Sequence, residues 1–317
     1  MNRVNELIKE YCPDGVPFQK VKDVYTRVKG TPITAGKMKE IACDDGEIRI
    51  FAGGKTIIDA HEKDIPKANI TRVPAVLVQS RGVIDVVYYD KPFTFKNEMW
   101  AYTSEDIVSV KFLYYVLKNS IQTFRDAASG MGSLPQISLK VTEEFMLPVP
   151  PLEVQREIVH ILDSFTLLTA ELTARKKQYE FYCNKLLTFD NNVKIVPLAD
   201  IADIGTGSSN TNEGLEEGKY PFYVRSQEPL RKNEYEYDET AIITAGDGVG
   251  VGKVFHYVEG KYALHQRAYR IHINTPDVLP RYYFHYMRSA FLPYIQKTMF
   301  QGSVASGVSQ SLCKPPN

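Results

Sequence analysis

The chain has 317 residues, of which 44% are hydrophobic and 24% are charged, a composition typical of a globular protein. Lysine and arginine together number 38, as do aspartate and glutamate, so the formal net charge is zero. This balance excludes a nucleic-acid binder that relies on bulk positive charge, although it permits a local basic groove. At roughly 100 to 200 residues per domain, the length predicts two domains.

The cysteines lie far apart in the sequence and form no C-x-x-C pair, which favours reduced thiols over a disulfide or zinc framework. They are Cys12, Cys43, Cys183 and Cys313. The first twenty residues contain no apolar signal core, and no stretch approaches the roughly 20 apolar residues that span a bilayer. We therefore expect a cytoplasmic protein without a membrane partner.

Residues 1–150 are predicted to form a mixed α/β domain with many short strands. Its landmarks are Phe18-Gln-Lys-Val-Lys-Asp-Val, the glycine turn Gly30-Thr31, the strands Ile50-Phe-Ala-Gly-Gly and Val76-Leu-Val-Gln-Ser-Arg-Gly, an aromatic-rich helix at 112–117, and the loop Gly132-Ser133. We interpret the aromatic residues of that helix as core rather than as a surface on which bases stack.

A long helix is predicted over residues 152–188, within a spacer segment at 151–190. Apolar side chains recur in alternating steps of three and four, which is the a/d seam of a coiled coil, with Arg175 as the one interruption. The seam residues are Ile158, Ile161, Phe165, Leu168, Leu172, Tyr179, Tyr182 and Leu186. Pro150-Pro151 suits the first turn of such a helix, and about 36 residues would make a rod of roughly 54 Å. The alternative is a core helix of one large domain.

Residues 191–317 repeat the landmarks of the first domain in the same order, which predicts a second copy of the same fold. The counterparts are Ile195-Val-Pro-Leu-Ala-Asp-Ile, Gly205-Thr206, Phe222-Tyr-Val-Arg-Ser, Ile242-Ile-Thr-Ala-Gly-Asp-Gly, the aromatic-rich helix at 282–286, and Gly302-Ser303. The fold class is therefore α+β, with two repeated mixed α/β domains separated by a long coiled-coil-forming helix.

The segment Leu147-Pro-Val-Pro-Pro-Leu-Glu-Val-Gln-Arg-Glu-Ile-Val-His-Ile-Leu-Asp, together with residues 168–182 and Lys185-Leu-Leu, resembles the central conserved region of specificity subunits of type I DNA restriction–modification systems. The resemblance implies two target-recognition domains held apart by antiparallel helices, each reading one half of a split target in double-stranded DNA. It implies a non-catalytic subunit whose helices dock two methyltransferase subunits, with translocating nuclease subunits as further partners. S-adenosylmethionine, ATP and Mg²⁺ would then belong to the partner subunits, and this chain would need no cofactor.

The chain departs from the family pattern after Gly302-Ser303, where no second long helix follows. This resembles the outcome of recombination among specificity genes. We therefore expect the seam of residues 158–186 to lack its intramolecular partner, and the isolated chain to self-associate through it.

Residues that read bases are expected in turns, because Arg and Lys suit guanine edges and Asn and Gln suit adenine. The candidates in the first copy are Arg49, Lys55, Gln79, Arg81, Lys96, Asn97 and Ser133. The candidates in the second copy are Arg225, Gln227, Lys253, Gln266, Arg267 and Ser303. The alternative for each of them is an ordinary surface residue.

Three catalytic interpretations compete with DNA reading: a phosphate-binding loop, a methyltransferase and a nuclease. The glycine-rich run 245–253 departs from the phosphate-binding loop, because Asp247 replaces the required glycine and Val254 the Ser or Thr, so a tight turn between strands is predicted. A methyltransferase acting on amino groups would carry an Asn/Asp-Pro-Pro-aromatic loop, and neither Pro-Pro pair has that setting.

A self-contained metal-dependent nuclease would pair Asp247 with Glu259-Gly-Lys261, or Asp203 with Glu217-Gly-Lys219. The six histidines show no H-E-x-x-H spacing. His256, His265 and His272 lie on neighbouring predicted strands, where a metal site is the alternative to ordinary polar strand positions, and the latter are preferred, so no metal site is predicted. A coiled-coil assembly protein without a nucleic-acid role is the remaining alternative.

Overall fold

The computed structural model describes residues 2–129, 134–189 and 196–298. The chain divides into two compact units, Met1–Glu171 and Leu172–Asn317, and the division falls inside a single helix. Across the described ranges, no helix combines the length and apolar character needed to cross a membrane.

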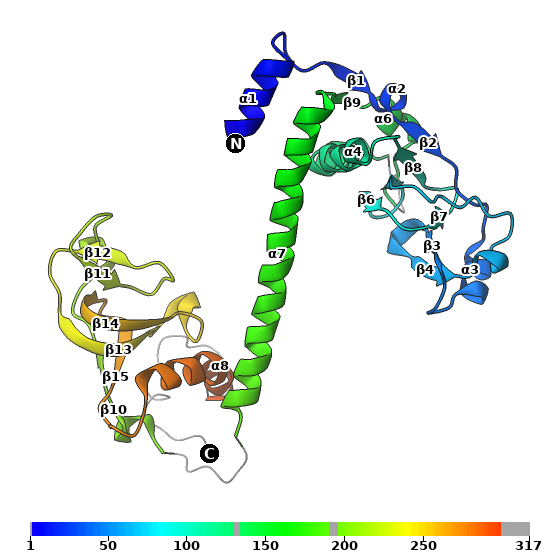
Figure 1. The fold of residues 1–317 in the computed structure, drawn as a ribbon. Coiled ribbons are helices and arrows are strands. Elements are labelled where there is room, and N and C mark those ends of the chain that lie inside the picture. Colours follow the sequence, from blue (N-terminus) through cyan, green and yellow to red (C-terminus); the bar gives the residue numbers. More distant parts are fainter. Residues whose placement is uncertain (1, 130–133, 190–195, 299–317) are drawn as a thin grey trace. The chain divides into compact units, whose positions relative to one another are not determined.

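The first unit contains seven helices and nine strands along the described chain, ending in the long helix α7 (Figure 1). In order they are α1 (Asn2–Tyr11), β1 (Phe18–Lys20), α2 (Val21–Val24), β2 (Thr26–Val28), α3 (Ala35–Ile41), β3 (Ile48–Phe51), the 3-10 turn η1 (Gly53–Lys55), β4 (Ile57–Ala60), the 3-10 turn η2 (Glu62–Asp64), β5 (Ala75–Gln79), β6 (Asp85–Tyr89), β7 (Phe93–Phe95), β8 (Trp100–Thr103), α4 (Ile107–Asn119), α5 (Ile121–Asp126), α6 (Leu139–Glu143), β9 (Met146–Pro148) and α7 (Leu152–Leu187). Helix α1 has no counterpart among the elements predicted from the sequence.

Three small sheets make up the strand layer of this unit, in the orders β2-β8-β5-β6, β4-β3-β7 and β1-β9. All pairs are antiparallel except β3 with β7, where Phe51 lies opposite Phe95. Every residue of β5 is buried, which is expected of a continuous apolar strand covered on both faces.

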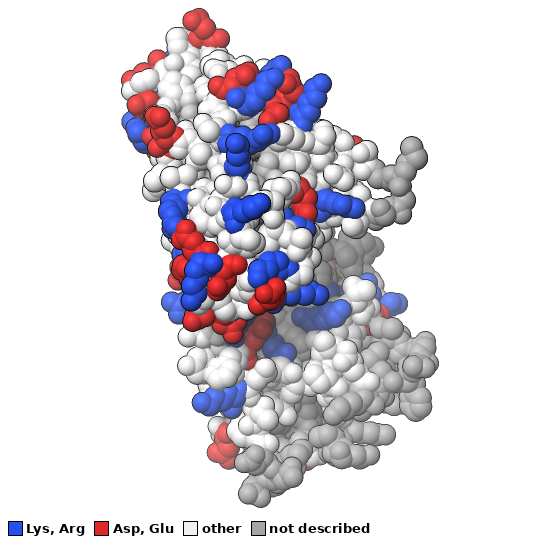
Figure 2. Space-filling model, turned by 90° about the vertical axis from the view of Figure 1, so that its right-hand side faces the viewer, with Lys and Arg blue, Asp and Glu red and all other residues white. Residues whose placement is uncertain are grey.

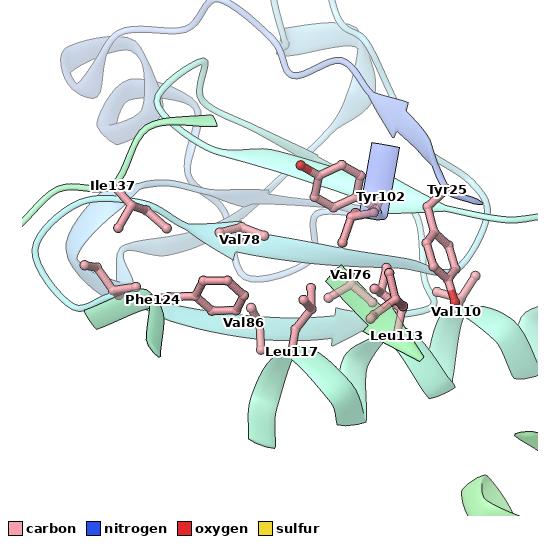
Figure 3. Close-up of a cluster of buried hydrophobic side chains, with 13 residues drawn as sticks. Tyr25, Val76, Val78, Val86, Tyr102, Val110, Leu113, Leu117, Phe124 and Ile137 are labelled. Carbon is pink, nitrogen blue, oxygen red and sulfur yellow. The ribbon is translucent and has the colours of Figure 1, made fainter. Parts of the chain in front are cut away.

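Two core clusters of the first unit lie on the two faces of β5, and a third lies around α3, β3 and β4. Val76 and Val78 face α4 and α5, where they pack with Leu113 and Phe124 (Figure 3). Leu77 and Ala75 belong to the opposite cluster with the phenylalanines of β7. Phe112, Leu113 and Leu117 are buried, so the aromatic-rich helix is a core element, as the sequence predicts.

Helix α7 begins at Leu152 and runs for 36 residues, which confirms the helix predicted over 152–188. Its start is fixed by the chain before it, because the Gln155 side-chain amide donates to the Pro150 carbonyl at 2.8 Å. Val154, Gln155 and Val159 are buried in the first unit. Asp163 accepts hydrogen bonds from Lys111 at 2.5 Å and Tyr115 at 2.6 Å, which ties the helix to α4.

The second unit is a six-stranded sheet in the order β10-β15-β13-β14-β11-β12, with helix α8 packed on it. Its elements are the 3-10 turn η3 (Leu198–Asp200), β10 (Ala202–Thr206), the 3-10 turn η4 (Thr211–Glu213), β11 (Tyr220–Tyr223), β12 (Leu230–Lys232), β13 (Tyr237–Ala245), the 3-10 turn η5 (Gly248–Gly250), β14 (Phe255–Leu264), β15 (Ala268–Ile273) and α8 (Pro280–Thr298). Strands β13 and β14 form an antiparallel hairpin closed by η5, so the glycine-rich run is the predicted turn between strands.

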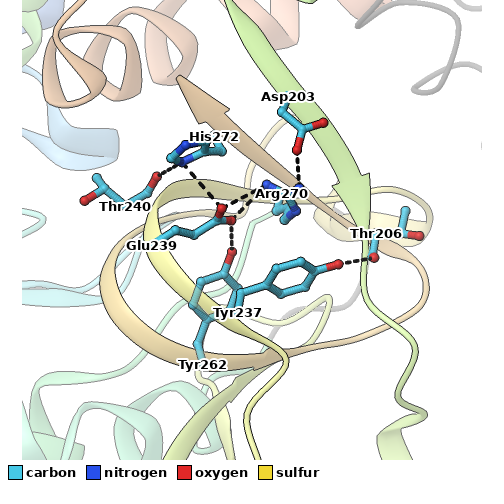
Figure 4. Close-up of polar contacts among 8 residues, drawn as sticks. All are labelled: Asp203, Thr206, Tyr237, Glu239, Thr240, Tyr262, Arg270 and His272. Atoms are coloured by element: carbon cyan, nitrogen blue, oxygen red, sulfur yellow. Dashed lines mark hydrogen bonds and ion pairs between the residues drawn. The ribbon is translucent and has the colours of Figure 1, made fainter. Parts of the chain in front are cut away.

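A polar network ties four strands of this sheet together, β10, β13, β14 and β15 (Figure 4). Glu239 on β13 accepts hydrogen bonds from Arg270 at 2.9 Å and from Tyr262 at 2.8 Å. Arg270 on β15 also pairs with Asp203 on β10. Burial and the adjacent Glu239 carboxylate together raise the pKa of Tyr262 above its ordinary value. The network is enclosed by protein, since Arg270 and Glu239 expose 12% and 17% of their side chains.

The internal repeat is visible in the backbone hydrogen bonds of the two units. The Thr31 and Ser209 amides donate to the carbonyls of Phe95 and Leu264, and the next residues, Lys96 and His265, donate to Phe51 and Tyr223. Gly30 and Gly207 precede these contacts, and a Cβ on either would lie 2.3 Å and 1.8 Å from the same carbonyl oxygens. The structural partner of Gly30 is therefore Gly207, two residues beyond the Gly205 predicted from the sequence.

Candidate nucleic-acid interface

Four loops of the first unit meet at one place, which we call loop cluster 1 and define as residues 52–55, 80–82, 96–99 and 134–137. Glu98 links three of them, because its carboxylate accepts from the Gly53 amide at 3.1 Å and its carbonyl accepts from the Ser80 hydroxyl. The fourth loop joins through the Gly82 amide, which donates to the Pro135 carbonyl at 2.9 Å. Turns that follow a rigid strand layer are suitable positions for ligand-binding side chains.

Several predicted base readers lie in or beside loop cluster 1. Arg81 and Asn97 are exposed, whereas Gln79 at the end of β5 is buried. Lys96 forms an ion pair with Glu98 at 3.0 Å. Burial opposes ionisation of Glu98, but the hydrogen bonds from Lys96 and Gly53 outweigh it and hold the pKa of this carboxyl below its usual value.

The other candidates of the first copy have different surroundings. Arg49 on β3 forms a bidentate pair with Asp59, at 2.8 and 2.9 Å, and lies 5.5 Å from the centre of the Tyr89 ring. It lines a separate groove with Tyr89 and Lys91. Among the described residues, the polar and ring partners of its side chain are Asp59 and Tyr89, neither of which belongs to loop cluster 1. Lys55 lies in η1, but its side chain and the whole of Ser133 fall outside the described residues.

The second unit has a corresponding loop cluster 2, which we define as residues 207–210, 225–228, 246–253 and 265–267. The Gln266 amide donates to the Ser209 carbonyl at 3.0 Å, and the Gly246 amide donates to the Arg267 carbonyl at 2.9 Å. A Cβ on Gly250 would lie 2.6 Å from the Arg225 carbonyl oxygen, so the glycine-rich turn packs directly on the loop after β11. Positive φ angles at Gly248 and Gly252, 75° and 69°, form this turn.

Two predicted base readers share one acidic partner in loop cluster 2. Asp247 pairs with Arg225 at 2.6 Å and with Arg267 at 3.2 Å. Burial disfavours its charged form, but the hydrogen bonds and charges of the two arginines outweigh burial and lower the pKa of Asp247. Arg225 and Arg267 expose 39% and 60% of their side chains, against 16% for Asp247. The carboxylate therefore orients two guanidinium groups that remain open to a ligand.

The remaining candidates of the second copy lie around the same turn. Gln227 and Lys253 are exposed, and the Gln266 side-chain amide donates to the side chain of Asn210. Ser303 lies outside the described residues. On the face drawn in Figure 2, lysines and arginines are interspersed with acidic residues. This agrees with local basic positions on a chain without net charge.

The seam of α7 is covered only in part. Ile158 and Ile161 are half-buried against the first unit, whereas Phe165, Leu168, Leu172, Tyr182 and Leu186 are exposed. In the second unit, the Tyr179 hydroxyl lies 3.1 Å from His285 Nδ1 and Arg288 lies 5.9 Å from the Tyr179 ring, both on α8. One seam residue therefore faces a neighbouring helix of its own unit. An exposed run of large apolar side chains suits contact with another helix.

The sequence matches the family described as "Type I restriction modification DNA specificity domain" over residues 13–179 and 190–310. The chain belongs to this family. The two matched ranges follow one another along the chain, and between them only the end of α7 and the first residues after it are unmatched. The predicted α+β fold, with two repeated units and a long helix between them in sequence, is therefore confirmed.

Among curated relatives, the chain is similar to a putative type I restriction enzyme specificity subunit of Haemophilus influenzae, with 27% identity over 228 residues. That alignment covers 62% of this chain and 58% of the relative. It is also similar to the EcoR124I/EcoR124II specificity subunit of Escherichia coli, with 29% identity over 43% of this chain and 39% of the relative. The chain thus spans little more than half the length of the first of these specificity subunits.

The fold has a solved counterpart in the S subunit of a type I restriction–modification system from M. genitalium. The TM-score is 0.67 at 18% sequence identity, over 95% of this chain and 84% of that one. At this identity the likeness concerns the fold alone. It extends over both units.

The nuclease sites considered from the sequence are not assembled in this specificity-family fold. Glu259 on β14 lies opposite Thr240 on β13, and Asp247 is seven residues beyond Thr240, just past the end of that strand. At the usual rise of a strand this is a separation of roughly 23 Å. Asp203 pairs with Arg270, whereas Lys219 lies over the Tyr220 ring. His256, His265 and His272 each have a different partner, namely the Ser226 carbonyl, the Arg267 amide and the Thr240 carbonyl.

One chemically interesting group escaped sequence reasoning. Cys43, Asp45 and His61 have ligand atoms within 4.8 Å of one another, and this is the sole group of its kind in the described part of the chain. Neither cysteine nor histidine has a recognisable spacing in the sequence, because the β3–β4 hairpin is what brings residue 61 back to residue 43. The only sequence signal for this group was the closeness of Cys43 and Asp45 along the chain.

Proposed function

We propose that the chain is a DNA-reading specificity subunit of a type I restriction–modification complex, in which each unit reads one half of a bipartite target. The observation that carries the proposal is the construction of loop clusters 1 and 2. They share backbone hydrogen bonds at equivalent positions but present different side chains, such as Arg81 in one and Asp247 with Arg225 in the other. A backbone scaffold shared by both units, with different side chains in its loops, is suited to recognising two different half-sites.

In this proposal the chain is non-catalytic and its docking surface is α7. The exposed seam residues Phe165, Leu168 and Leu172 would receive helices of methyltransferase subunits, with nuclease and translocase subunits joining the assembly. S-adenosylmethionine, ATP and Mg²⁺ would be bound by those partners, and the complex would act in the cytoplasm. Because one helix joins both units, the two half-sites should be separated by a fixed number of base pairs.

Methylation mapping tests the proposal. The gene would be expressed with its cognate methyltransferase in cells free of other modification, and methylated bases would be located across the genome. We expect one split motif with a constant spacer. Insertion of seven residues after Glu171 would keep the heptad phase of α7 and lengthen it by about 10.5 Å, so the spacer should change while both half-sites stay the same. A contiguous motif, or no methylation with a functional methyltransferase present, would contradict the proposal.

A further inference from the structure

A group of soft and charged side chains lies in the first unit, apart from loop cluster 1. Cys43 follows α3, Asp45 lies in the loop before β3, and His61 follows β4. One ligand atom from each lies within 4.8 Å of the other two. We propose that these three residues bind a Zn²⁺-class divalent transition metal ion.

The imidazole of His61 is oriented by a carboxylate on the side away from the group. Glu47 Oε2 lies 2.8 Å from His61 Nδ1, and Glu47 Oε1 accepts from the Glu62 amide at 2.9 Å. The carboxylate therefore accepts a hydrogen bond from the Nδ1–H group, and Nε2 is directed at Asp45, whose Oδ1 is 3.5 Å away. A histidine that ligates a metal commonly donates its other ring nitrogen to a carboxylate in this manner.

The separation of the ligand atoms suits a tetrahedral ion. With Zn–N and Zn–O distances of about 2.0 to 2.2 Å, two ligand atoms at the tetrahedral angle lie about 3.4 Å apart. The 3.5 Å between His61 Nε2 and Asp45 Oδ1 matches this value. Cys43 completes one face of the tetrahedron and leaves a fourth position for water.

The loop that carries two of the ligands is held against β4 by its backbone. The Cys43 amide donates to the Asp59 carbonyl at 2.9 Å. A Cβ on Gly46 would lie 2.2 Å from the Ala60 nitrogen, so the chain approaches β4 more closely than any residue with a side chain permits. The ligands therefore belong to a fixed hairpin rather than to a free loop.

Charge and donor type both indicate the class of metal. Ligation by Cys43 requires loss of the thiol proton to solvent, after which the thiolate and the Asp45 carboxylate neutralise a divalent cation, with neutral His61 as the third ligand. Thiolate and imidazole together favour Zn²⁺ or Co²⁺ over Mg²⁺ and Ca²⁺, which prefer oxygen ligands. Cys43 is half-exposed and Asp45 exposed, so an ion can reach the site from solvent.

Cobalt titration of the full chain tests the proposal. The purified protein would be reduced, freed of metal with a chelator and titrated with Co²⁺ in an absorption spectrometer. We expect one Co²⁺ per chain, a near-ultraviolet thiolate-to-cobalt band, visible bands of tetrahedral cobalt, and loss of all of them on addition of one equivalent of Zn²⁺. Absence of the thiolate band in the unaltered protein would overturn the proposal.

Variants separate this site from adventitious binding. C43S should abolish the thiolate band, D45N and H61N should weaken Co²⁺ binding at least tenfold, and E47Q should weaken it by about 10- to 100-fold through misorientation of the imidazole. C183S, which alters a half-exposed cysteine on α7, is the matched control and should bind like the unaltered chain. Zn²⁺ should raise the thermal unfolding midpoint of the unaltered chain but not of C43S, whose circular dichroism without metal should be unchanged. A band that survives in C43S or disappears in C183S would refute the assignment.

Discussion

Asp247 and Arg267, which pair at 3.2 Å, occupy the backbone positions that Arg81 and Glu98 hold in the first unit. The equivalence rests on geometry, because Gly82 and Gly248 follow Arg81 and Asp247 with φ angles of 78° and 75°. The acid and the base have exchanged places between the two copies. Equivalent loops therefore carry their arginine at opposite positions, which in the proposed complex would direct it to a different place on the DNA.

Substitution of Arg267 should weaken recognition of one half-site only. Removal of a guanidinium that reads a base costs about 1 to 3 kcal/mol of discrimination. We therefore expect R267A to lose this amount of base discrimination at the second half-site and to keep the discrimination at the first half-site unchanged. Competition binding to single-base variants of the mapped motif, with the methyltransferase present, would measure this. The matched control is K261A, on β14 at the end of the β13–β14 hairpin that lies away from Asp247. An equal loss in K261A would contradict the placement of the interface.

Asp247 should act as an orienting group and not as a ligand for a catalytic metal. Arg225 and Arg267 already hold its carboxylate. We expect the isolated chain to cleave no duplex DNA with Mg²⁺ or Mn²⁺, and D247N to reduce sequence discrimination because both guanidinium groups lose their common anchor. Cleavage by the unaltered chain that disappears in D247A would support the nuclease hypothesis instead.

Glu144 should contribute to the pH dependence of stability in the first unit. Lys20 and Lys22 each lie 2.5 Å from its carboxylate and lower its pKa from 4.5 to about 2. Because the folded pKa lies below the unfolded one, this stabilisation is present above pH 4.5 and is lost as the pH falls towards 2. E144Q should therefore be less stable than the unaltered chain at pH 6, and most of this difference should be lost by pH 2.

Thermal unfolding of the two proteins between pH 6 and pH 2 would measure this difference. E105Q, at an exposed position in the same unit, is the control and should follow the unaltered chain at every pH. If the unfolding midpoints of E144Q and the unaltered chain differed by a constant amount down to pH 2, the ionised carboxylate would have no role.

The Glu239–Arg270 pair should be important for the stability of the second unit. Removal of one partner of a buried ion pair costs about 3 to 5 kcal/mol, because the other charge remains buried. Arg270 also contacts Asp203, so E239Q should lie near the lower limit, about 3 kcal/mol. Because the chain has two units, hydrogen exchange of amides in β13 and β15 is the appropriate measurement. E217Q, at an exposed loop position, should exchange like the unaltered chain; protection that persists in E239Q would show that the pair is dispensable.

Features with a local or periodic signal could be predicted from the sequence. The three–four spacing of apolar residues located α7 to within a residue of Leu152–Leu187. The repeated landmarks predicted two similar units. Both signals can be read directly from the sequence, because periodicity and order along the chain are themselves sequence properties.

Side-chain partnerships could not be predicted, because they form between loops distant in sequence. Arg49 was assigned to DNA reading, but Asp59, ten residues further along, binds it across the β3–β4 hairpin. Asp247 meets Arg225 and Arg267 only because two loops pack on the glycine-rich turn. For a similar reason the counterpart of Gly30 is Gly207 and not the predicted Gly205, since close approach to the Leu264 carbonyl requires glycine at residue 207.

The seam of α7 should drive self-association of the isolated chain, and two adjacent leucines allow a matched test. Leu168 lies on the seam and Leu167 lies off it, yet both are more than half exposed, at 58% and 70%. Burial of a leucine contributes about 1.5 to 3 kcal/mol. A charge at residue 168 would be placed inside the helix pair, whereas a charge at residue 167 would stay in solvent. In sedimentation at micromolar concentration we expect dimers for the unaltered chain and for L167E, and monomers for L168E. A stable monomer of the unaltered chain would contradict pairing through the seam, and dissociation by L167E as well as L168E would place the contact on another face of the helix.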